Sequence, residues 1–468
     1  MGKFQETEAN VFATNPGNAR TSAEMLTIQG LFDYYHFCAY FGEINMRIRW
    51  VPYLAIIIGL SGSPWALGQD VNPADLLKAA DEMVQVTARL RNLPPKAPIE
   101  RGIKNRPEIS QYLDEQVKEN YSENELQREG TTLRILGVIP ASIDYRGFVL
   151  KLYSEQIAGF YDGDKKTFFV ASWLSAEEQK PVMVHELDHA LQDQYFDVMK
   201  VLKEDRKSGN SDRSMAHQAL FEGDATVIML NFELAGAKRT FDTLPDLALA
   251  MRALLLGMQS QFPVFKSAPP YLQESMFFPY AYGASFLQKA WAKNPSWDFV
   301  DKIYKDLPSS TEQILHPDKY FGTRDEPQPV NAEVLVPKIG DDWKVVYKNV
   351  LGEFSLNLML NMHLSEERSK RSAAGWGGDQ VLLLENGEGK NAVLVNTVWD
   401  NPNEAAEFFQ SMQVWLQQKN PNAAKSDETD KGFSLQHDNE VESIRHEGAN
   451  VRFVLGLPAS YAPQLKAF

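Results

Sequence analysis

The sequence predicts an α+β fold, with a mainly helical domain over residues 69–330 and a smaller α+β domain over residues 331–468. The first observation is that apolar residues recur at helical spacing through much of the first segment. The second is that β-rich runs and a hairpin signal characterise the last hundred residues. Proline, aspartate and other charged residues accumulate over 323–342, which is typical of a linker between the two domains.

The elements of the first domain follow in order from local patterns. Asn72-Pro73 is a helix start, and residues 72–91 carry apolar residues at helical spacing after it. The polar, glycine-containing segment 204–213 predicts a loop. The patterns predict further helices within 107–158 and over 176–196, 214–236 and 246–260, and strands near 98–104 and 166–172.

In the second domain, the residue pattern changes from helical spacing to β-rich runs. Runs 381–384 and 392–398 are rich in β-forming residues and flank the turn-forming segment 385–390, which predicts a hairpin. A helix is expected from Pro402, because its apolar residues share one face. Two more β-rich runs lie near 432–437 and 451–455, so we expect a small α+β sandwich.

Charge and cysteine content exclude several classes of protein. The formal net charge is -15, which argues against nucleic acid or an anionic membrane as the main partner, since both reward clustered Lys and Arg. Cys38 is the single cysteine, so neither a disulfide within the chain nor a cysteine-based zinc site is possible. Any metal must therefore be held by histidine and carboxylate.

Residues 46–68 have the layout of a secretory signal peptide. Two arginines precede a short apolar run, and small residues end at Gly68. The run is shorter than the ~20 residues that cross a bilayer, so we expect export to the periplasm or outside the cell, without a stable transmembrane anchor. The alternative is a buried hydrophobic segment. Because signal peptides begin at the initiator, Met46 is the expected start, and residues 1–45 are expected to be a non-native extension.

One motif carries specific chemistry: residues 185–189 read His-Glu-Leu-Asp-His and match H-E-x-x-H. His185 and His189 lie one turn apart on the same helix face, so both imidazoles can reach one metal ion. Glu186 is placed to take a proton from a water molecule on that metal, and zinc suits this donor set. The alternative is two surface histidines on an ordinary amphipathic helix.

A third ligand is required, and Glu222 is the candidate. It lies in an apolar helical run, where a carboxylate is costly to bury unless it is paired or metal-bound. Asp193 or His217 could be the ligand instead, with Glu222 solvated. Gly223 would let the two helices approach closely. The longer H-E-x-x-H-x-x-G-x-x-H motif is excluded, because Gln192 and Tyr195 occupy its later positions.

With H-E-x-x-H on one helix and a glutamate ligand on a following helix, the chain resembles the gluzincin, thermolysin-like zinc peptidases. More narrowly, it is similar to a set of secreted bacterial HExxH proteins without a well-defined substrate. The blocks that carry this narrower resemblance are 155–162, 185–197, 222–226, 278–280, 310–317 and 375–379.

The resemblance implies a zincin-like catalytic domain. It also implies that Phe168–Ala171 is an edge strand able to bind an extended peptide. Thermolysin-like enzymes place an aspartate four residues after the glutamate ligand, and here that position is Thr226. The group that orients a ligand imidazole must then be another one, with Asp224 and Asp193 as candidates.

Hydrolysis also needs a hydrogen-bond donor to the oxyanion that forms when water attacks a carbonyl group. Tyr280 and His316 are the candidates for this donor, and His217 is the next candidate after them. Trp376, in a glycine-rich run, is either a binding aromatic or a core residue beside a turn, and the second interpretation is favoured. We therefore expect an exported zinc metallopeptidase that acts on peptides or proteins. The rival hypotheses are a catalytically inactive zinc-binding protein serving as an envelope or cell-wall binding module, and a metal-free structural protein.

Overall fold

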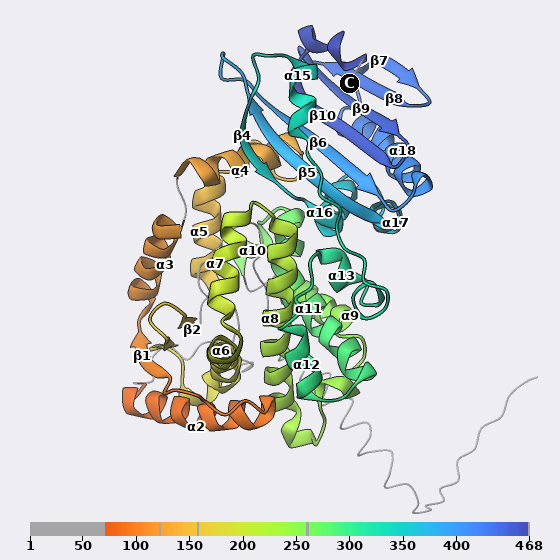
Figure 1. The fold of residues 1–468 in the computed structure, drawn as a ribbon. Helices are drawn as coiled ribbons and strands as arrows, with labels where there is room; N and C mark the ends of the chain where they lie inside the picture. The colour runs from red at the N-terminus through yellow and green to blue at the C-terminus, as the bar shows by residue number, and fades with distance from the viewer. Residues whose placement is uncertain (1–70, 121–122, 157–158, 259–261, 467–468) are drawn as a thin grey trace, which may run out of the picture.

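The computed structural model describes residues 71–466, with gaps at 121–122, 157–158 and 259–261. The expected signal peptide and the preceding extension lie outside the described residues. The predicted α+β class is confirmed, because a mainly helical part with a three-stranded sheet is followed by a seven-stranded sheet. Figure 1 shows the large sheet at one end of the molecule and helix α2 (Pro73–Arg91) at the other.

The helical part contains the predicted helices and strands within a few residues. Its elements up to the candidate site are α2 (Pro73–Arg91), β1 (Glu100–Lys104), α3 (Arg106–Asn120), α4 (Glu123–Ile135), α5 (Tyr145–Gln156), β2 (Gly159–Asp162), β3 (Thr167–Ala171), α6 (Ala176–Phe196), α7 (Val198–Ser208) and α8 (Ser211–Leu234). They are followed by α9 (Leu247–Met258), α10 (Pro263–Lys266), α11 (Pro270–Lys293), α12 (Trp297–Ile303), α13 (Thr311–Leu315) and α14 (Asp318–Phe321).

The loop predicted over 204–213 is wrong. Helix α7 runs through Ser208, and α8 already begins at Ser211. The reversal takes only two residues: Gly209 adopts the left-handed conformation, with φ 65°, and Asn210 caps α8 by accepting from the Arg213 backbone N–H. The polar composition belongs to the exposed face of an amphipathic helix.

The small sheet has the order β1-β3-β2, with β3 parallel to β1 and antiparallel to β2. Strand β3 is therefore the central strand, and the expectation that Phe168–Ala171 forms an edge is wrong. Both sides of β3 are already paired, so it has no free row of backbone groups for a peptide. The edges of this sheet, within the described residues, are β1 and β2.

The large sheet is antiparallel in the order β4-β5-β6-β10-β9-β8-β7. The predicted hairpin is β5–β6. Trp376, on β5, is fully buried and donates from Nε1 to Asp379, which agrees with the core interpretation. The elements are α15 (Val336–Ile339), β4 (Lys344–Asn349), α16 (Gly352–Asn361), α17 (Glu366–Ala373), β5 (Trp376–Glu385), β6 (Asn391–Trp399), α18 (Pro402–Lys419), β7 (Ala424–Thr429), β8 (Gly432–His437), β9 (Glu440–Glu447) and β10 (Asn450–Pro458).

One hydrophobic cluster runs from the helical part into the large sheet, from Leu76 to Leu455. Helix α4 belongs to the first part of the chain but reaches up to the large sheet in Figure 1. Near its end, the Ile135 carbonyl accepts from Lys419 of α18. The two parts therefore share a continuous apolar interior.

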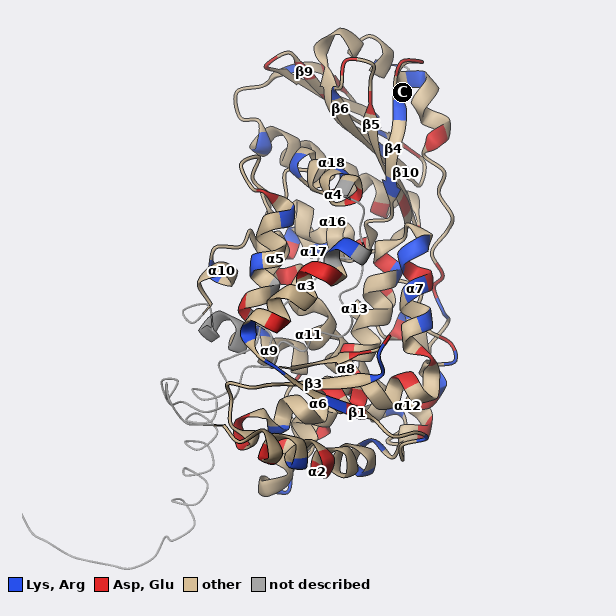
Figure 2. Ribbon diagram, turned by 90° about the vertical axis from the view of Figure 1, so that its left-hand side faces the viewer, with Lys and Arg blue, Asp and Glu red and all other residues tan. Residues whose placement is uncertain are grey.

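Charged residues are interspersed over the surface rather than gathered by sign. In Figure 2, blue and red segments alternate along α2 and α7.

Among the described residues, no helix combines the length and apolar content that crossing a membrane requires.

Helices α8 and α11 cross at a pair of glycines. A Cβ on Gly223 would lie 2.3 Å from the carbonyl carbon of Gly283, and a Cβ on Gly283 would lie 1.8 Å from the Ala219 carbonyl oxygen. The close approach expected at Gly223 is therefore made to α11. Because backbone atoms form the contact, neither helix can yield by a side-chain rotation.

Gly223→Ala is expected to destabilise the protein by about 1–3 kcal/mol, since an added methyl group must force α8 and α11 apart. The measurement is thermal or denaturant unfolding of the parent and the variant. Gly236→Ala is the control, because a Cβ there meets nothing within 4 Å. Equal stability of Gly223→Ala and the parent would contradict this account of the crossing.

A buried carboxylate joins the start of α8 to the start of α13. Asp212 Oδ1 accepts hydrogen bonds from the Thr311 backbone N–H and hydroxyl group. Burial, with smaller contributions from Asp379 and Glu353, raises the pKa of Asp212 to about 8, against the two bonds from Thr311, which lower it. Asp212 is therefore protonated in the folded protein at neutral pH, and ionised in the unfolded chain.

The unfolding free energy is expected to fall as the pH rises from about 4 to about 8. A carboxyl group whose pKa is higher in the folded protein than in the unfolded chain stabilises the fold while it stays protonated. Between the two pKa values, this contribution falls by up to about 1.4 kcal/mol for each pH unit that the pH rises. Asp212→Asn keeps an acceptor for Thr311 and should give a shallower slope of unfolding free energy against pH. The exposed Asp341→Asn is the control. An unchanged slope in Asp212→Asn would show that another group causes the pH dependence.

Candidate metal centre

Helix α6 carries the H-E-x-x-H motif and is buried on every side over its middle turns. Ser175 begins it with a capping box, in which its side chain accepts from the Glu178 N–H and the Glu178 carboxylate accepts from the Ser175 N–H. Every residue from Pro181 to Asp193 is buried. Polar side chains on such a helix require partners, so the alternative of two surface histidines does not hold.

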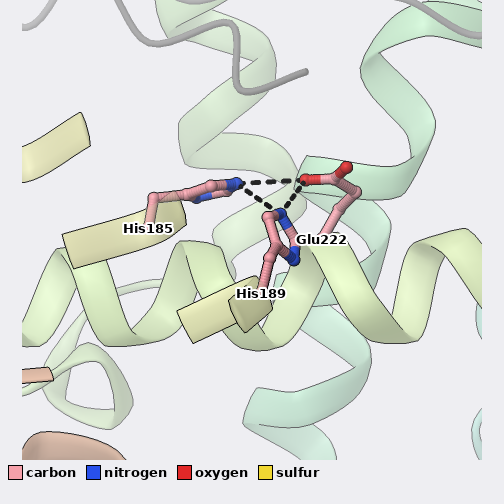
Figure 3. Close-up of side chains that lie close together, drawn as sticks. All are labelled: His185, His189 and Glu222. Atoms are coloured by element: carbon pink, nitrogen blue, oxygen red, sulfur yellow. Dashed lines mark hydrogen bonds and ion pairs between the residues drawn. The ribbon is translucent and has the colours of Figure 1, made fainter. Parts of the chain in front are cut away.

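Three side chains converge at the centre of the helical part. His185 and His189 project from α6 toward the carboxylate of Glu222 on α8 (Figure 3). Glu222 Oε2 lies 3.1 Å from His185 Nε2 and 3.2 Å from His189 Nε2, and the two Nε2 atoms are 3.1 Å apart. Both histidines have no exposed side-chain surface, and the Glu222 side chain is 11% exposed.

The protonation states of this triad suit metal binding. Burial and the neighbouring His189 lower the pKa of His185 to about 4, although the hydrogen bond to the Glu222 carboxylate opposes that shift. Burial alone would raise the pKa of Glu222, but the two imidazoles lower it to about 2. At neutral pH, His185 is therefore neutral and Glu222 is ionised, which are the forms that ligate a metal.

The donor set fits zinc. Two imidazole nitrogens and one carboxylate oxygen are ligands that zinc prefers, at distances of about 2.0–2.2 Å. A tetrahedron of that size has edges of about 3.3–3.6 Å. The three donor atoms are separated by 3.1–3.2 Å, so a small tetrahedral cation matches their spacing with little movement. The same atoms form a group within 4.8 Å of one another.

Glu186 follows His185 on α6 but does not belong to the group of three donors. Its Oε2 accepts a hydrogen bond of 2.7 Å from the Tyr161 backbone N–H on β2, the edge strand that packs against α6. The side chain is fully buried. The carboxylate therefore sits between the ligand-bearing helix and the edge of the small sheet.

The structure separates the two candidates for the oxyanion donor. The Tyr280 ring, on α11, is stacked on the His185 ring with centroids 6.1 Å apart. His316 instead ends α13, where its Nε2 is 2.8 Å from Glu353 Oε1 on α16. Thr311 of α13 contacts Asp212, which lies ten residues before Glu222, or about 15 Å along α8. Of the two, Tyr280 is the one that the structure brings to the triad.

The alternative third ligands have other partners. Asp193 accepts from the Tyr161 hydroxyl at 3.0 Å and from Lys166. His217 Nδ1 is 2.6 Å from Asp205 Oδ2. Neither side chain belongs to the group of donors that converges with His185.

A residue next to the motif contacts a ligand histidine. Gln192 Oε1 is 3.2 Å from His189 Nδ1, and its Nε2 donates to Asp188 Oδ2 at 2.7 Å and to the Phe221 carbonyl at 3.0 Å. In the sequence, Gln192 stood out only as a departure from the longer H-E-x-x-H-x-x-G-x-x-H motif. Its position three residues after His189 on one helix was the available signal.

Asp224, a candidate for orienting an imidazole, instead belongs to a buried ion-pair cluster. Arg91 of α2 donates to Asp224 at 2.9 Å and to Asp301 of α12 at 2.8 Å, and the Tyr304 hydroxyl donates to Asp224 at 2.7 Å. Burial raises the pKa of Asp224, against the attraction of Arg91. The cluster ties α2 and α12 to the ligand-bearing α8.

A second acidic group in the described residues surrounds a lysine side chain. Glu312, Asp325 and Asp400 lie together, but the Lys319 ammonium group is 2.6, 2.8 and 2.9 Å from their carboxylates. Burial would lower the pKa of Lys319, and the three carboxylates raise it far above its ordinary value. This group is an ion-pair network with its own cation, which distinguishes it from the histidine-containing centre.

Comparison with known proteins bears on the second domain. Residues 344–465 match the family described as Domain of unknown function (DUF8575). The matched segment begins with β4 and covers all seven strands of the large sheet. No curated protein and no solved structure matches the chain. The family match therefore coincides with the large sheet domain and lies outside the residues of the metal centre.

Proposed function

We propose that the protein is a zinc-dependent metallopeptidase of the gluzincin type. The observation that carries this proposal is the convergence of His185, His189 and Glu222, with Glu186 directly after His185 on α6. The expected signal peptide over 46–68 places the proposed activity outside the cytoplasm, secreted or periplasmic. The substrate class is a peptide or protein.

His185, His189 and Glu222 would hold the zinc ion through two imidazole nitrogens and one carboxylate oxygen. Zinc, when bound, supplies a Lewis acid that polarises a carbonyl group and acidifies a water molecule. Glu186 accepts the proton of the attacking water on its carboxylate. It then delivers that proton to the amide nitrogen, which leaves as an amine when the C–N bond breaks.

Tyr280 is the proposed donor to the oxyanion that forms during this attack. Its ring stacks on the His185 ring, which holds the phenol close to the ligand helix. A phenolic O–H can donate one hydrogen bond to a developing negative charge, and such donors stabilise the transition state. His316 is not proposed for this role, because its imidazole is engaged with Glu353.

The direct test combines metal analysis with a peptide digest. The purified protein is expected to contain one zinc ion per chain and to cleave members of a broad peptide library. A chelator should abolish cleavage, and added zinc should restore it. Zinc-loaded protein that cleaves no peptide would contradict the peptidase function, and protein that binds no zinc would contradict the metal centre itself.

A zinc-binding protein without peptidase activity is the second candidate. One observation favours it: Glu186 already has a structural partner, the Tyr161 backbone N–H, so its presence in the motif has an explanation other than catalysis. In that case the large sheet domain would be the contact surface for an envelope or cell-wall partner. The peptide digest separates this candidate from the peptidase.

A further inference from the structure

We propose that Gln192 is a positioning residue of the metal centre. Its side-chain oxygen accepts from His189 Nδ1 and thereby directs the lone pair of His189 Nε2 toward His185 and Glu222. This inference rests on the proposed zinc centre, but it concerns a residue outside the H-E-x-x-H motif.

The orientation of the Gln192 amide follows from its other neighbour. The Phe221 carbonyl oxygen can only accept a hydrogen bond, so the group 3.0 Å from it must be the amide NH₂. The opposite orientation would place two oxygens against each other in a fully buried site. The side-chain oxygen therefore faces His189 Nδ1, at 3.2 Å.

This orientation selects one tautomer of His189. A nitrogen that faces an amide oxygen must carry the proton, so a neutral His189 ring has Nδ1–H and an unprotonated Nε2. His189 Nε2 is the atom that lies 3.1 Å from His185 Nε2 and 3.2 Å from Glu222 Oε2. A metal-ligating histidine commonly depends on such a partner at its other nitrogen.

The same amide has two separable roles. Through its oxygen it orients an imidazole of α6. Through its NH₂ group it joins α6 to the Phe221 carbonyl, directly before Glu222 on α8, and donates to Asp188 Oδ2. Loss of the oxygen should affect zinc affinity, whereas loss of the NH₂ group should affect the stability of the fold.

The test measures the zinc Kd of the full chain by competition with a chelating dye. Gln192→Met keeps the length of the side chain and removes its hydrogen bonds, so the Kd should rise about 10- to 100-fold. The matched control is Gln194→Met on the same helix, since the Gln194 oxygen accepts from the Lys96 and Ala97 N–H groups rather than from an imidazole. Its Kd should stay within about twofold of the parent's.

A second variant separates positioning from structure. Gln192→Glu keeps an acceptor for His189 Nδ1 but has no donor for Asp188 or Phe221. The positioning role predicts that Gln192→Glu melts at a lower temperature than Gln192→Met in the metal-free form and yet binds zinc more tightly. If the parent, Gln192→Met and Gln192→Glu instead rank in the same order by zinc affinity as by melting temperature, the role of Gln192 is structural and the proposal is overturned.

The outcomes also distinguish this proposal from the proposed function. If the parent binds zinc and Gln192→Met has an unchanged Kd, the positioning role is wrong and the metal centre stands. If Gln192→Met weakens zinc binding as expected while the parent cleaves no peptide, the positioning role is supported and the peptidase function is contradicted. If Gln192→Glu does not fold, the comparison of Gln192→Met with Gln194→Met decides the question.

Discussion

Glu186→Gln is expected to reduce peptide hydrolysis by about 10²- to 10⁴-fold while the zinc content stays at one ion per chain. Gln has nearly the same shape, and its oxygen can still accept from the Tyr161 N–H, so the contact with β2 should survive. The amide cannot take a proton from water. On the helix, Glu186 points about 100° away from His185, which keeps it out of the ligand set.

The measurement is the initial rate on a peptide that the parent cleaves, together with zinc content and melting temperature of both proteins. Glu177→Gln is the matched control, because Glu177 lies on the same helix with its side chain 80% exposed. Equal rates for the parent and Glu186→Gln would exclude Glu186 as the general base. A lower melting temperature with lost zinc would assign Glu186 a structural role instead.

Glu222→Ala is expected to weaken zinc binding by more than the ~100-fold that removal of an orienting partner costs, because it removes one of three protein ligands. The two imidazoles lower the pKa of the Glu222 carboxyl group, so it is ionised at neutral pH and also supplies negative charge to the site. The measurement is the zinc Kd of the variant and its metal content after dialysis.

Asp193→Asn and His217→Ala are the controls for Glu222→Ala, since both residues were candidate ligands from the sequence. Asp193 binds Tyr161 and Lys166, and His217 is paired with Asp205, so neither change should release zinc. Loss of zinc from Asp193→Asn, with zinc retained in Glu222→Ala, would overturn the gluzincin assignment.

The α+β class and most helices could be predicted because they depend on local patterns. A capping residue, a proline at a helix start and apolar residues at helical spacing act within a few residues of each other. The boundaries of α6 followed from such signals. The loop over 204–213 was mispredicted because composition alone does not distinguish the exposed face of α7 from a loop.

The spacing of His185 and His189 was enough to predict that both imidazoles can reach one metal ion, since residues four apart lie on one helix face whatever surrounds them. The apolar run around Glu222 also indicated that residue, because a buried carboxylate needs a partner. The contacts between residues far apart in the sequence became known from the packed structure: Asp224 with Arg91, His316 with Glu353, Gly223 with Gly283, and Phe221 with Gln192. The packed structure also placed β3 at the centre of its sheet. These pairings are set by how whole helices and strands pack, and no local rule of helix or strand geometry contains that information.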